Sequence, residues 1–490
     1  MDGHDVVIVG GGIVGAAIAW KLSRYNLSIA LVEASPELAA VVSKANGGVI
    51  HAGYDPKPGS LKARLNVRGA FQYPRLAARL GFKFNRTGSL VVGLEDTDSN
   101  YIKSLFVNGQ TNGIPDLQII YSDTIRAIVP RVNPQARVAL YAPSTGVVDP
   151  FEVTLAFAEN ALTNGVAIFR DCPVTGITRL PDGFVVHTSR GNFRARMVVN
   201  AAGLYADEVA AMVGQTDFVI KGRLGEVLVL DKELRTQIKP VLFPIPTPHS
   251  KGIIIIPTVS GNLLVSATAR MVTDKENVAT TAGGVAELLR GMHKLVPDLS
   301  SSQIIRQFSG IRAVVEAPYE DFVISPAPGV KGFINAAGIQ SPGIAAAPAI
   351  AEIVRDLLED QGLELKEKTD YKPYREVPVR MQELSAPEQE RLIKANPAYG
   401  QVVCRCEGIT AGEIIDSIRR PLGATTIDGV KRRTRTGMGR CQGGFCQSRV
   451  LAILAQEMGK EPGEIWLEYA GSPVVTGLLK GGITHAAKAF

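Results

Sequence analysis

Four of the five cysteines in this 490-residue chain form two close pairs in its C-terminal fifth. Cys404 and Cys406 are separated by one residue, whereas Cys441 and Cys446 are separated by four in the segment RCQGGFC. Clustered thiols in an intracellular chain favour a metal site over disulfides, and four thiolates suit zinc or an iron–sulfur cluster. Zinc pairs usually have about two to four residues between them, so the one-residue gap favours the cluster and leaves zinc as the alternative. The fifth, Cys172, has no partner pattern and is expected to be packed.

A glycine-rich segment near the start of the chain has the spacing of a dinucleotide-binding loop. Gly10, Gly12 and Gly15 form G-x-G-x-x-G between the apolar run DVVIV (5–9) and a segment with helical apolar spacing. The first glycine permits a tight turn, the second a close approach to pyrophosphate, and the third close packing of helix on strand. Glu33 ends the next apolar segment, where it can accept a hydrogen bond from an adenosine ribose hydroxyl. We expect a dinucleotide with its phosphates at the helix N-terminus, and the loop leaves FAD and NAD open.

The elements that must position these residues alternate between strand and helix. The first βαβ unit implies a parallel α/β sheet. Segments 196–210 and 331–354 both repeat an apolar strand followed by NAAG, which predicts that both return to one nucleotide site. Between them, GSLVVGL, EVLVLD, GIIIIPTV and GNLLVSA predict a separate, largely antiparallel layer. The polar segment 363–400 predicts a linker before the cysteine module.

Composition narrows the class of protein. The chain is 46% hydrophobic and 20% charged, as in soluble globular proteins, and its length predicts two to four domains. No apolar run is long enough for a membrane helix, and the N-terminus lacks the basic region of a signal peptide, so we expect a cytoplasmic protein with no direct membrane span. The net charge of +6 is modest, and the basic run KRRTR (431–435) has no interleaved aromatics. We therefore expect no nucleic-acid partner.

Several segments carry a family resemblance that covers roughly residues 4–360. They are ANGGVIHAGYDPKPGSLKARLNVRG (45–69), NAAGLYAD (200–207), FSGIRAV (308–314), DFVI (321–324) and NAAGIQSPGIAAAPAI (335–350). Together they resemble the glycerol-3-phosphate dehydrogenase and oxidase group of the D-amino-acid-oxidase-like FAD oxidoreductases. The resemblance implies FAD as the cofactor, in a Rossmann-like FAD-binding domain with an inserted antiparallel-sheet substrate domain over the flavin ring.

The C-terminal pattern CRCEGIT…TRTGMGRCQGGFC resembles the bacterioferritin-associated-ferredoxin-like domain, which implies a small helical domain that binds a 2Fe-2S cluster. Glycine amides around Cys441 and Cys446 are expected to turn toward the sulfurs. The basic run 431–435 is expected to stabilise the cluster charge, to dock an acidic partner, or to be a solvated loop.

These patterns predict the following organisation of the chain. The fold class is α/β, with an FAD-dependent oxidoreductase over 1–362, a linker over 363–400, an iron–sulfur domain over 401–460 and a tail over 461–490. Within the oxidoreductase, the FAD domain is expected at about 1–80, 145–215 and 310–362, and the substrate domain at about 81–144 and 216–309.

The residues expected to bind FAD lie in the glycine loop, after the second strand, in the segment 45–69 and in the two NAAG segments. They are Gly10, Gly12, Ile13, Val14, Gly15, Glu33, Ala34, Asn46, Gly47, Gly48, Ala202, Gly203, Gly338, Ile339, Gln340, Ser341 and Gly343. The expected cluster ligands are Cys404, Cys406, Cys441 and Cys446.

The resemblance also implies a catalytic base. Oxidation of a secondary alcohol needs a group that takes the hydroxyl proton, and histidine suits this role near neutral pH. Of the six histidines, only His51 lies in the flavin-adjacent HAG motif. The alternative is a histidine that packs against the flavin without titrating.

Three residues match the phosphate-binding positions of the group: Lys251 in SKGIIIIP, Arg312 in SGIRAV and Ser341 in GIQSPG. A planar guanidinium and an ammonium suit a dianionic phosphate, and they equally suit a carboxylate. Arg312 is expected to act in both catalysis and substrate binding. The alternatives are an exposed loop lysine at Lys251 and an internal salt bridge from Arg312 to Asp321 or Glu316.

The function implied is FAD-dependent oxidation of sn-glycerol-3-phosphate, a small anionic substrate, to dihydroxyacetone phosphate. Electrons are then expected to pass through the 2Fe-2S cluster to one or more redox partner subunits, either flavoproteins or iron–sulfur proteins. A membrane-bound partner would hold the protein at the inner face of the membrane. The sequence departs from the usual pattern of the glycerol-3-phosphate group at Gly47, Gly48, Glu226 and the segment 266–270, which lie in the substrate layer. The alternatives are a dehydrogenase of a 2-hydroxy acid such as L-2-hydroxyglutarate, a dehydrogenase of an amino or imino acid, an electron-transfer module without its own substrate, and an oxidase without a partner.

Overall fold

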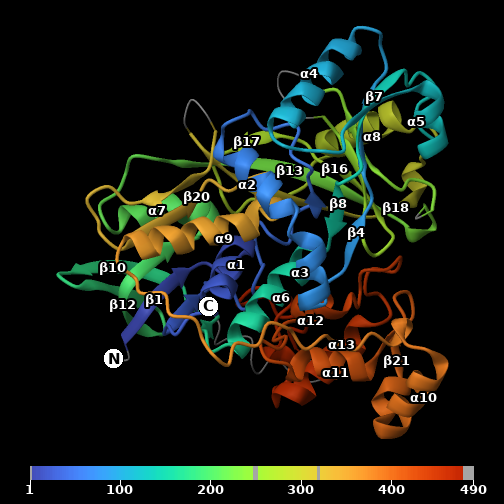
Figure 1. Ribbon diagram of the computed structural model, residues 1–490. Helices are drawn as coiled ribbons and strands as arrows, with labels where there is room; N and C mark the ends of the chain where they lie inside the picture. Colours follow the sequence, from blue (N-terminus) through green and yellow to red (C-terminus); the bar gives the residue numbers. More distant parts are fainter. Residues whose placement is uncertain (1–2, 235, 247–251, 317–319, 478–490) are drawn as a thin grey trace.

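The computed structural model describes residues 3–234, 236–246, 252–316 and 320–477 (Figure 1). Its first sheet has five parallel strands in the order β9-β2-β1-β12-β20. Their sequences, such as VVIV in β1 and IALV in β2, are continuous apolar runs, as expected for parallel strands buried on both faces. The strands are β9 (Ala167–Phe169), β2 (Ile29–Val32), β1 (Gly3–Val9), β12 (Gly191–Asn200) and β20 (Phe333–Ala337). Antiparallel strands β10 (Val174–Leu180), β11 (Gly183–Thr188) and β19 (Val323–Pro326) extend this sheet.

The register of this sheet brings three distant segments to one edge. Val9 of β1 lies opposite Asn200 of β12, which lies opposite Asn335 of β20. The amide of Asn200 donates to the side-chain oxygen of Asn335 at 2.9 Å, so the first residues of the two NAAG segments bind each other. The glycine loop after β1 and both NAAG segments therefore meet at the carboxyl ends of neighbouring strands, where α/β sheets bind ligands.

One face of the sheet is covered by three helices: α1 (Ile13–Leu22), α6 (Pro150–Thr163) and α9 (Gly343–Asp360), with α1 packed against the other two (Figure 1). Alternate residues of β1 contribute to the core on this face and to a second core on the opposite face. Cys172 is buried in that second core, which confirms its expected packing. Among the residues that the structure describes, no helix has both the length and the apolar character needed to cross a membrane.

The second sheet has nine strands and confirms the expected antiparallel layer, except that β14 and β5 are parallel. Its order is β17-β13-β16-β15-β14-β5-β7-β6, and β18 pairs with β13. The bounds are β17 (Arg270–Val272), β13 (Ile220–Leu230), β16 (Leu263–Ser266), β15 (Ile254–Pro257), β14 (Val241–Pro244), β5 (Ser89–Gly93), β7 (Val138–Ala142), β6 (Gln118–Tyr121) and β18 (Ile304–Val315). Helices α4 (Asp98–Thr111), α5 (Ser122–Ile128) and α8 (Ala282–Leu295) flank it.

Smaller elements join the two sheets. A three-stranded sheet consists of β3 (Val49–Ile50), β8 (Gly146–Val148) and β4 (Phe84–Arg86). Helices α2 (Leu61–Ala70) and α3 (Tyr73–Leu80) follow β3 in the chain, and α2 packs against α9. The mixed α/β architecture, with an antiparallel sheet inserted between segments of the nucleotide-binding sheet, confirms the expected fold class.

The C-terminal module has its own apolar core, which includes Cys404 and Cys446. It contains β21 (Val402–Cys404), β22 (Ile409–Thr410), α11 (Ala411–Arg419), α12 (Ile427–Thr434) and α13 (Gln447–Met458), and α12 contacts α6 (Figure 1). The preceding segment 363–400 contains the exposed helix α10 (Ala386–Ala395). This segment is also fixed to α6, because buried Arg375 pairs with buried Glu159 at 2.7 Å.

Candidate active site and cluster site

The glycine loop after β1 has a geometry that requires glycine. Gly10 has a φ of +109°, and a side-chain carbon there would lie 2.4 Å from the carbonyl oxygen of Ala201. A side-chain carbon at Gly15 would lie 1.9 Å from the carbonyl oxygen of Gly10, so the helix packs directly on the loop. Gly12 precedes α1, whose first turn starts with Ile13 and Val14 and contains no acidic residue. The first turn of α1 therefore presents the positive end of the helix to a phosphate without an acidic residue of its own.

Glu33 connects the end of β2 to the glycine loop. Its carboxylate accepts hydrogen bonds from the amide of Gly11 at 2.6 Å and from the amide of Ser35 at 2.8 Å, and the predicted FAD contact Ala34 lies between Glu33 and Ser35. Burial raises the pKa of Glu33, and these backbone donors oppose that rise. The acid thus lies beside the loop, at the position from which it can accept from a ribose hydroxyl. Glycine loop, helix terminus and acid together fit the dinucleotide FAD.

The remaining predicted FAD contacts lie on loops that return to this edge. Gly48 has a φ of +70° and its amide donates to the side chain of Asn46 at 2.8 Å, with Gly47 between them. A side-chain carbon at Gly48 would lie 2.1 Å from the carbonyl oxygen of Val148. Ala202 and Gly203 follow β12, while Gly338, Ile339, Gln340 and Ser341 link β20 to Gly343 at the start of α9.

A cavity of about 620 Å³ lies between the two sheets, and residues that are expected to act on the substrate line it. His51 follows β3, Arg312 lies on β18, and Ser341 precedes α9, and all three line this cavity. The Nε2 of His51 and the Oγ of Ser341 are 3.5 Å apart, and the ring of Phe243 lies 5.9 Å from the His51 ring. Lys251 lies outside the described residues, although its neighbour Gly252 lines the cavity.

Arg312 has no carboxylate partner among the residues that the structure describes; its Nη1 donates to the carbonyl oxygen of Thr268 at 3.3 Å. Burial, and then the nearby Arg223, lower the pKa of Arg312 to about 10. The expected alternative partners are engaged elsewhere. Glu316 pairs with Lys221 at 3.3 Å, and Asp321 accepts from the first amides of α2. A half-buried guanidinium without a counter-ion favours an anionic ligand in this cavity.

Sequence patterns missed several further charged residues that line the cavity, among them Arg223, Glu320 and Lys62. Arg223 lies directly opposite Arg312 in the β13–β18 pair, so both project from the same face, and Arg223 binds Glu320 at 2.7 Å. Lys62 reaches the carbonyl oxygen of Glu320 and lies 5.8 Å from the centre of the Phe322 ring. The motif KPGSLKA, which contains Lys62, was the only available signal, because the pairing of β13 with β18 joins residues 89 positions apart.

The four cysteines of the C-terminal module lie in two pairs that join its two cysteine segments. The sulfurs of Cys406 and Cys441 are 3.5 Å apart, and the side chains of Cys404 and Cys446 also hydrogen-bond each other. Four thiols are the soft donors that an iron–sulfur cluster takes, so the donor set fits a 2Fe-2S cluster held by these cysteines.

Backbone amides of the glycine-rich loop face one of these sulfurs. Burial raises the pKa of Cys441, but hydrogen bonds from the amide of Phe445, the Cys406 thiol and the amides of Gly443 and Gly444 together outweigh it, so the net pKa is lowered. The glycines thus turn amides toward a thiolate, as the sequence predicted.

The basic run 431–435 contacts the rest of the chain, which corrects the expectation of a solvated loop. Arg433 binds Glu37 at 2.8 Å, and both side chains are at least 94% buried. Glu37 follows Glu33 in the loop after β2 and also accepts from the amide of Thr425 at 2.7 Å. Arg435 also lies 3.8 Å from Asp149 at the start of α6, whereas the pairs of Arg432 with Glu468, Arg435 with Glu407 and Lys431 with Asp428 lie within the module. Arg433 and Arg435 therefore connect the cysteine module to the nucleotide-binding domain.

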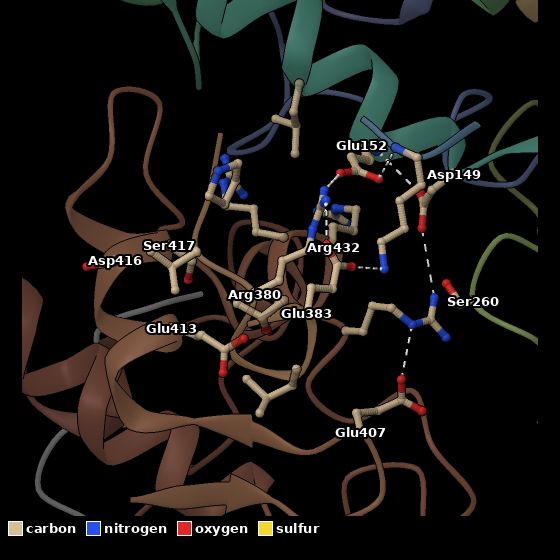
Figure 2. A pocket seen from close by; sticks show the side chains of 18 of the residues that line it. Asp149, Glu152, Ser260, Arg380, Glu383, Glu407, Glu413, Asp416, Ser417 and Arg432 are labelled. Carbon is tan, nitrogen blue, oxygen red and sulfur yellow. Dashed lines mark hydrogen bonds and ion pairs between the residues drawn. The ribbon is translucent and has the colours of Figure 1, made fainter. Parts of the chain in front are cut away.

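A second cavity, of about 290 Å³, lies at this junction, and acidic and basic side chains line it (Figure 2). Its charges are largely paired: Glu152 with Arg380, Glu383 with Lys83 and Glu407 with Lys232. Asp149 caps α6, and burial, followed by the nearby Glu152, raises its pKa to about 7. This cavity is an interface between domains whose charges compensate each other.

Comparison with known proteins identifies both parts of the chain. The family model described as FAD dependent oxidoreductase matches residues 5–357, and that described as BFD-like [2Fe-2S] binding domain matches residues 402–456. The chain is 41% identical to a glycerol 3-phosphate dehydrogenase from Caloramator mitchellensis, over 97% of this chain and 99% of that protein.

Two further relatives match the N-terminal part. The structure of L-α-glycerophosphate oxidase from Mycoplasma pneumoniae, with FAD bound, superposes on this chain with a TM-score of 0.74 and 31% identity. The superposition covers 78% of this chain and 100% of the oxidase chain. The mitochondrial L-2-hydroxyglutarate dehydrogenase of Caenorhabditis briggsae is 33% identical over 66% of this chain and 80% of its own length. The oxidase structure therefore has no counterpart for about a fifth of this chain.

Proposed function

Because the chain belongs to the FAD dependent oxidoreductase family and carries a BFD-like 2Fe-2S domain, we propose that it oxidises sn-glycerol-3-phosphate to dihydroxyacetone phosphate. We further propose that the electrons leave through the cluster to a partner redox subunit. The dehydrogenase from Caloramator mitchellensis supports the substrate, since it matches this chain over nearly the full length of both proteins. The observation that carries the proposal is the cavity where Arg312, without a counter-ion among the described residues, lies near the His51–Ser341 pair.

In this proposal, residues of the chain itself bind the substrate and take its hydroxyl proton. Arg312 binds the anionic end of the substrate, assisted by Lys251 as a second cation. His51 takes the hydroxyl proton, and Ser341, 3.5 Å from its Nε2, helps to orient the imidazole or the hydroxyl. When bound, FAD supplies the hydride acceptor and the cluster supplies a carrier of single electrons. Phe243 packs beside the His51 ring and keeps part of the cavity apolar.

The contacts between the two regions support electron delivery from one to the other. Arg306, on the same strand as Arg312, donates to the side chain of Gln442 in the cysteine loop at 3.0 Å. Arg306 lies six positions before Arg312 on β18, so their backbones are about 20 Å apart along the strand. The buried pair of Arg433 with Glu37 holds the module at this place. The FAD-dependent oxidoreductase family model ends at residue 357, before the cysteine module, which suggests that the module is an addition that passes electrons on from the flavin.

A second candidate function is dehydrogenation of a 2-hydroxy acid. The relative named L-2-hydroxyglutarate dehydrogenase is 33% identical, and a carboxylate would satisfy Arg312 as well as a phosphate does. The two candidates share the proton transfer at His51 and differ only in the anionic group that the cavity holds.

An anaerobic substrate screen tests the proposed function. The FAD-loaded protein is mixed without oxygen with sn-glycerol-3-phosphate, L-2-hydroxyglutarate or proline, and bleaching of the flavin absorbance is followed. We expect rapid bleaching with sn-glycerol-3-phosphate alone. Rapid bleaching by the hydroxy acid without reaction of the phosphate would overturn the assigned substrate, and no bleaching by any of the three would favour a module without its own substrate.

A further inference from the structure

The loops that carry the cysteines also carry an exposed aromatic residue. Phe445 directly precedes Cys446 and is 80% exposed, more than any other large hydrophobic residue that the structure describes. A single exposed apolar side chain is common on protein surfaces and needs no special explanation. Its neighbours therefore decide whether Phe445 belongs to a contact surface.

The four cysteines are unequally exposed. Cys404 and Cys446 are buried in the core of the module, whereas Cys406 is exposed and Cys441 is half-buried. The sulfurs of Cys406 and Cys441 lie 3.5 Å apart, so this pair forms the solvent-facing side of the site. Phe445 lies on the same loop as Cys441 and therefore next to this outer pair.

The segments around the cysteines are positively charged. Residues 401–406 and 439–449 contain Arg405, Arg440 and Arg449 and no aspartate or glutamate, and Arg449 lies in the first turn of α13, directly after the cysteine loop. Arg440 pairs with Asp231 and Glu233 of the substrate domain. Arg405 and Arg449 are exposed, and neither has a carboxylate partner among the described residues. The charges of the run 431–435 are paired within the chain, so the unpaired charge near the cysteines comes from Arg405, which precedes Cys406, and from Arg449, three positions after Cys446.

We propose that Arg405, Cys406, Phe445 and Arg449 form a docking surface, named the exit face, for a small one-electron carrier protein with an acidic surface around its redox centre. This inference rests on the proposed function, because it specifies the partner to which electrons are delivered. At each encounter one electron passes from the reduced cluster to the oxidised carrier, with no bond formed or broken and no group transferred. The arginines attract the acidic surface, and Phe445 packs against the carrier beside the outer pair.

Charge also argues against the other occupants of this face. A second copy of the chain, docked by two-fold symmetry, would bring Arg405 and Arg449 against the same arginines of its partner. An anionic membrane surface would satisfy the charge, but it offers no acceptor for the electron. Both occupants are outcomes of the experiment below.

The experiment uses the full chain loaded with FAD and cluster and reduced chemically with dithionite, so that its result does not depend on the natural substrate. After excess reductant is removed, the protein is mixed with cytochrome b5 as an acidic probe, cytochrome c as a basic probe, or a neutral quinone. Binding of oxidised cytochrome b5 is measured separately by calorimetry. The variants are Arg405→Glu with Arg449→Glu, Phe445→Ser, and Arg290→Glu as a matched control at an exposed position on α8.

We expect the double arginine variant to bind and reduce cytochrome b5 at least tenfold more weakly at low salt, with a smaller salt dependence. Phe445→Ser weakens binding without changing the salt dependence. Arg290→Glu and the reaction with the quinone stay unchanged, and cluster absorbance shows that each variant is loaded. Should Arg405→Glu impair loading, Arg449→Glu alone gives the same comparison.

Three results would overturn the exit face. The first is equal reduction of cytochrome b5 by the double variant and the unchanged protein, or a preference of the unchanged protein for cytochrome c. The second is a change in self-association, measured by sedimentation, that follows the same substitutions. The third is binding to vesicles of anionic lipid that these substitutions abolish without affecting cytochrome b5. These three measurements use protein reduced with dithionite, so they stay valid if sn-glycerol-3-phosphate fails to reduce the flavin. That failure would contradict only the proposed substrate.

Discussion

The two cavities of this protein are both lined by charged residues, but their charges are arranged differently. At the junction with the cysteine module, acids and bases alternate and pair, as Glu152 does with Arg380 (Figure 2). In the cavity between the two sheets, Arg312 has no carboxylate partner among the described residues and lies opposite a second arginine, Arg223. The junction cavity carries its own counter-charges, whereas in the other cavity Arg223 is paired with Glu320 and Arg312 has no carboxylate partner among the described residues.

This difference separates an interface from a ligand site. Charge that is paired within the chain stabilises the contact between two domains and leaves nothing for a ligand to neutralise. A buried charge without a partner raises the free energy of the empty site. A substrate anion that pairs with this charge therefore binds with the full free energy of the ion pair. The following substitutions test that distinction in both cavities.

His51→Asn gives the largest expected effect. Loss of the base should lower the rate of flavin reduction by sn-glycerol-3-phosphate by about 10²- to 10⁴-fold, because general base catalysis contributes about that much. Stopped-flow bleaching without oxygen measures the rate, and FAD content checks loading. A histidine that only packs against the flavin would give a change of less than about threefold.

Arg312→Met should lower kcat/KM for the anionic substrate by about 10²- to 10³-fold, since it removes the charge that binds the substrate anion. Arg312→Lys should recover part of this loss. Arg435→Met, at the junction cavity, is the matched control and should leave flavin reduction unchanged. Equal losses in both arginine variants would remove the distinction between the two cavities.

Glu37→Gln should destabilise the docked module by about 3 kcal/mol, because it leaves the guanidinium of Arg433 buried without its counter-ion. Burial raises the pKa of Glu37, but Arg433 and Arg170 outweigh it, so the net pKa is lowered and this stabilisation is lost as the pH falls through that lowered pKa. Denaturant unfolding followed by cluster absorbance measures the loss. Flavin reduction should be preserved, and a variant as stable as the unchanged protein would contradict an anchoring role for this pair.

The smallest effect is expected from Asp149→Asn. Burial raises the pKa of Asp149 to about 7, so the folded protein holds this proton more tightly than the unfolded chain does. Its contribution to stability is complete at acidic pH and is lost as the pH rises through 7, by at most about 1.4 kcal/mol per pH unit. The asparagine variant should flatten the decline in stability between about pH 4 and 7, measured by thermal unfolding. An unchanged slope would show that Asp149 is already ionised across this range.

The sequence predicted the features that depend on residues lying close together in the chain. Gly10, Gly15 and Glu33 lie within one βαβ unit, so the loop, the helix and the acid could be placed from local pattern alone. The paired cysteines were visible for the same reason. The repeated NAAG motif indicated that two distant strands return to one place, and Asn200 bonded to Asn335 shows how they meet.

The features that the sequence did not reveal depend on long-range pairing. Arg223 joins the substrate cavity only because β13 pairs with β18, and strands of similar pattern offer many alternative partners. Arg433 and Glu37 are 396 residues apart, so nothing in the run KRRTR indicated an internal partner. Charged runs are usually solvated, and burial of this one is a property of the domain interface.

The central claim is that one substrate supplies electrons which reach the cluster through the flavin, and a single anaerobic mixing experiment tests it most directly. The loaded protein is mixed with sn-glycerol-3-phosphate in one turnover, and flavin bleaching is followed by absorbance while the cluster is followed by electron paramagnetic resonance on frozen samples. We expect the flavin to bleach first and the signal of the reduced cluster to appear afterwards in the same molecules. A bleached flavin beside a cluster that stays oxidised, in a sample where dithionite can still reduce that cluster, would contradict the account.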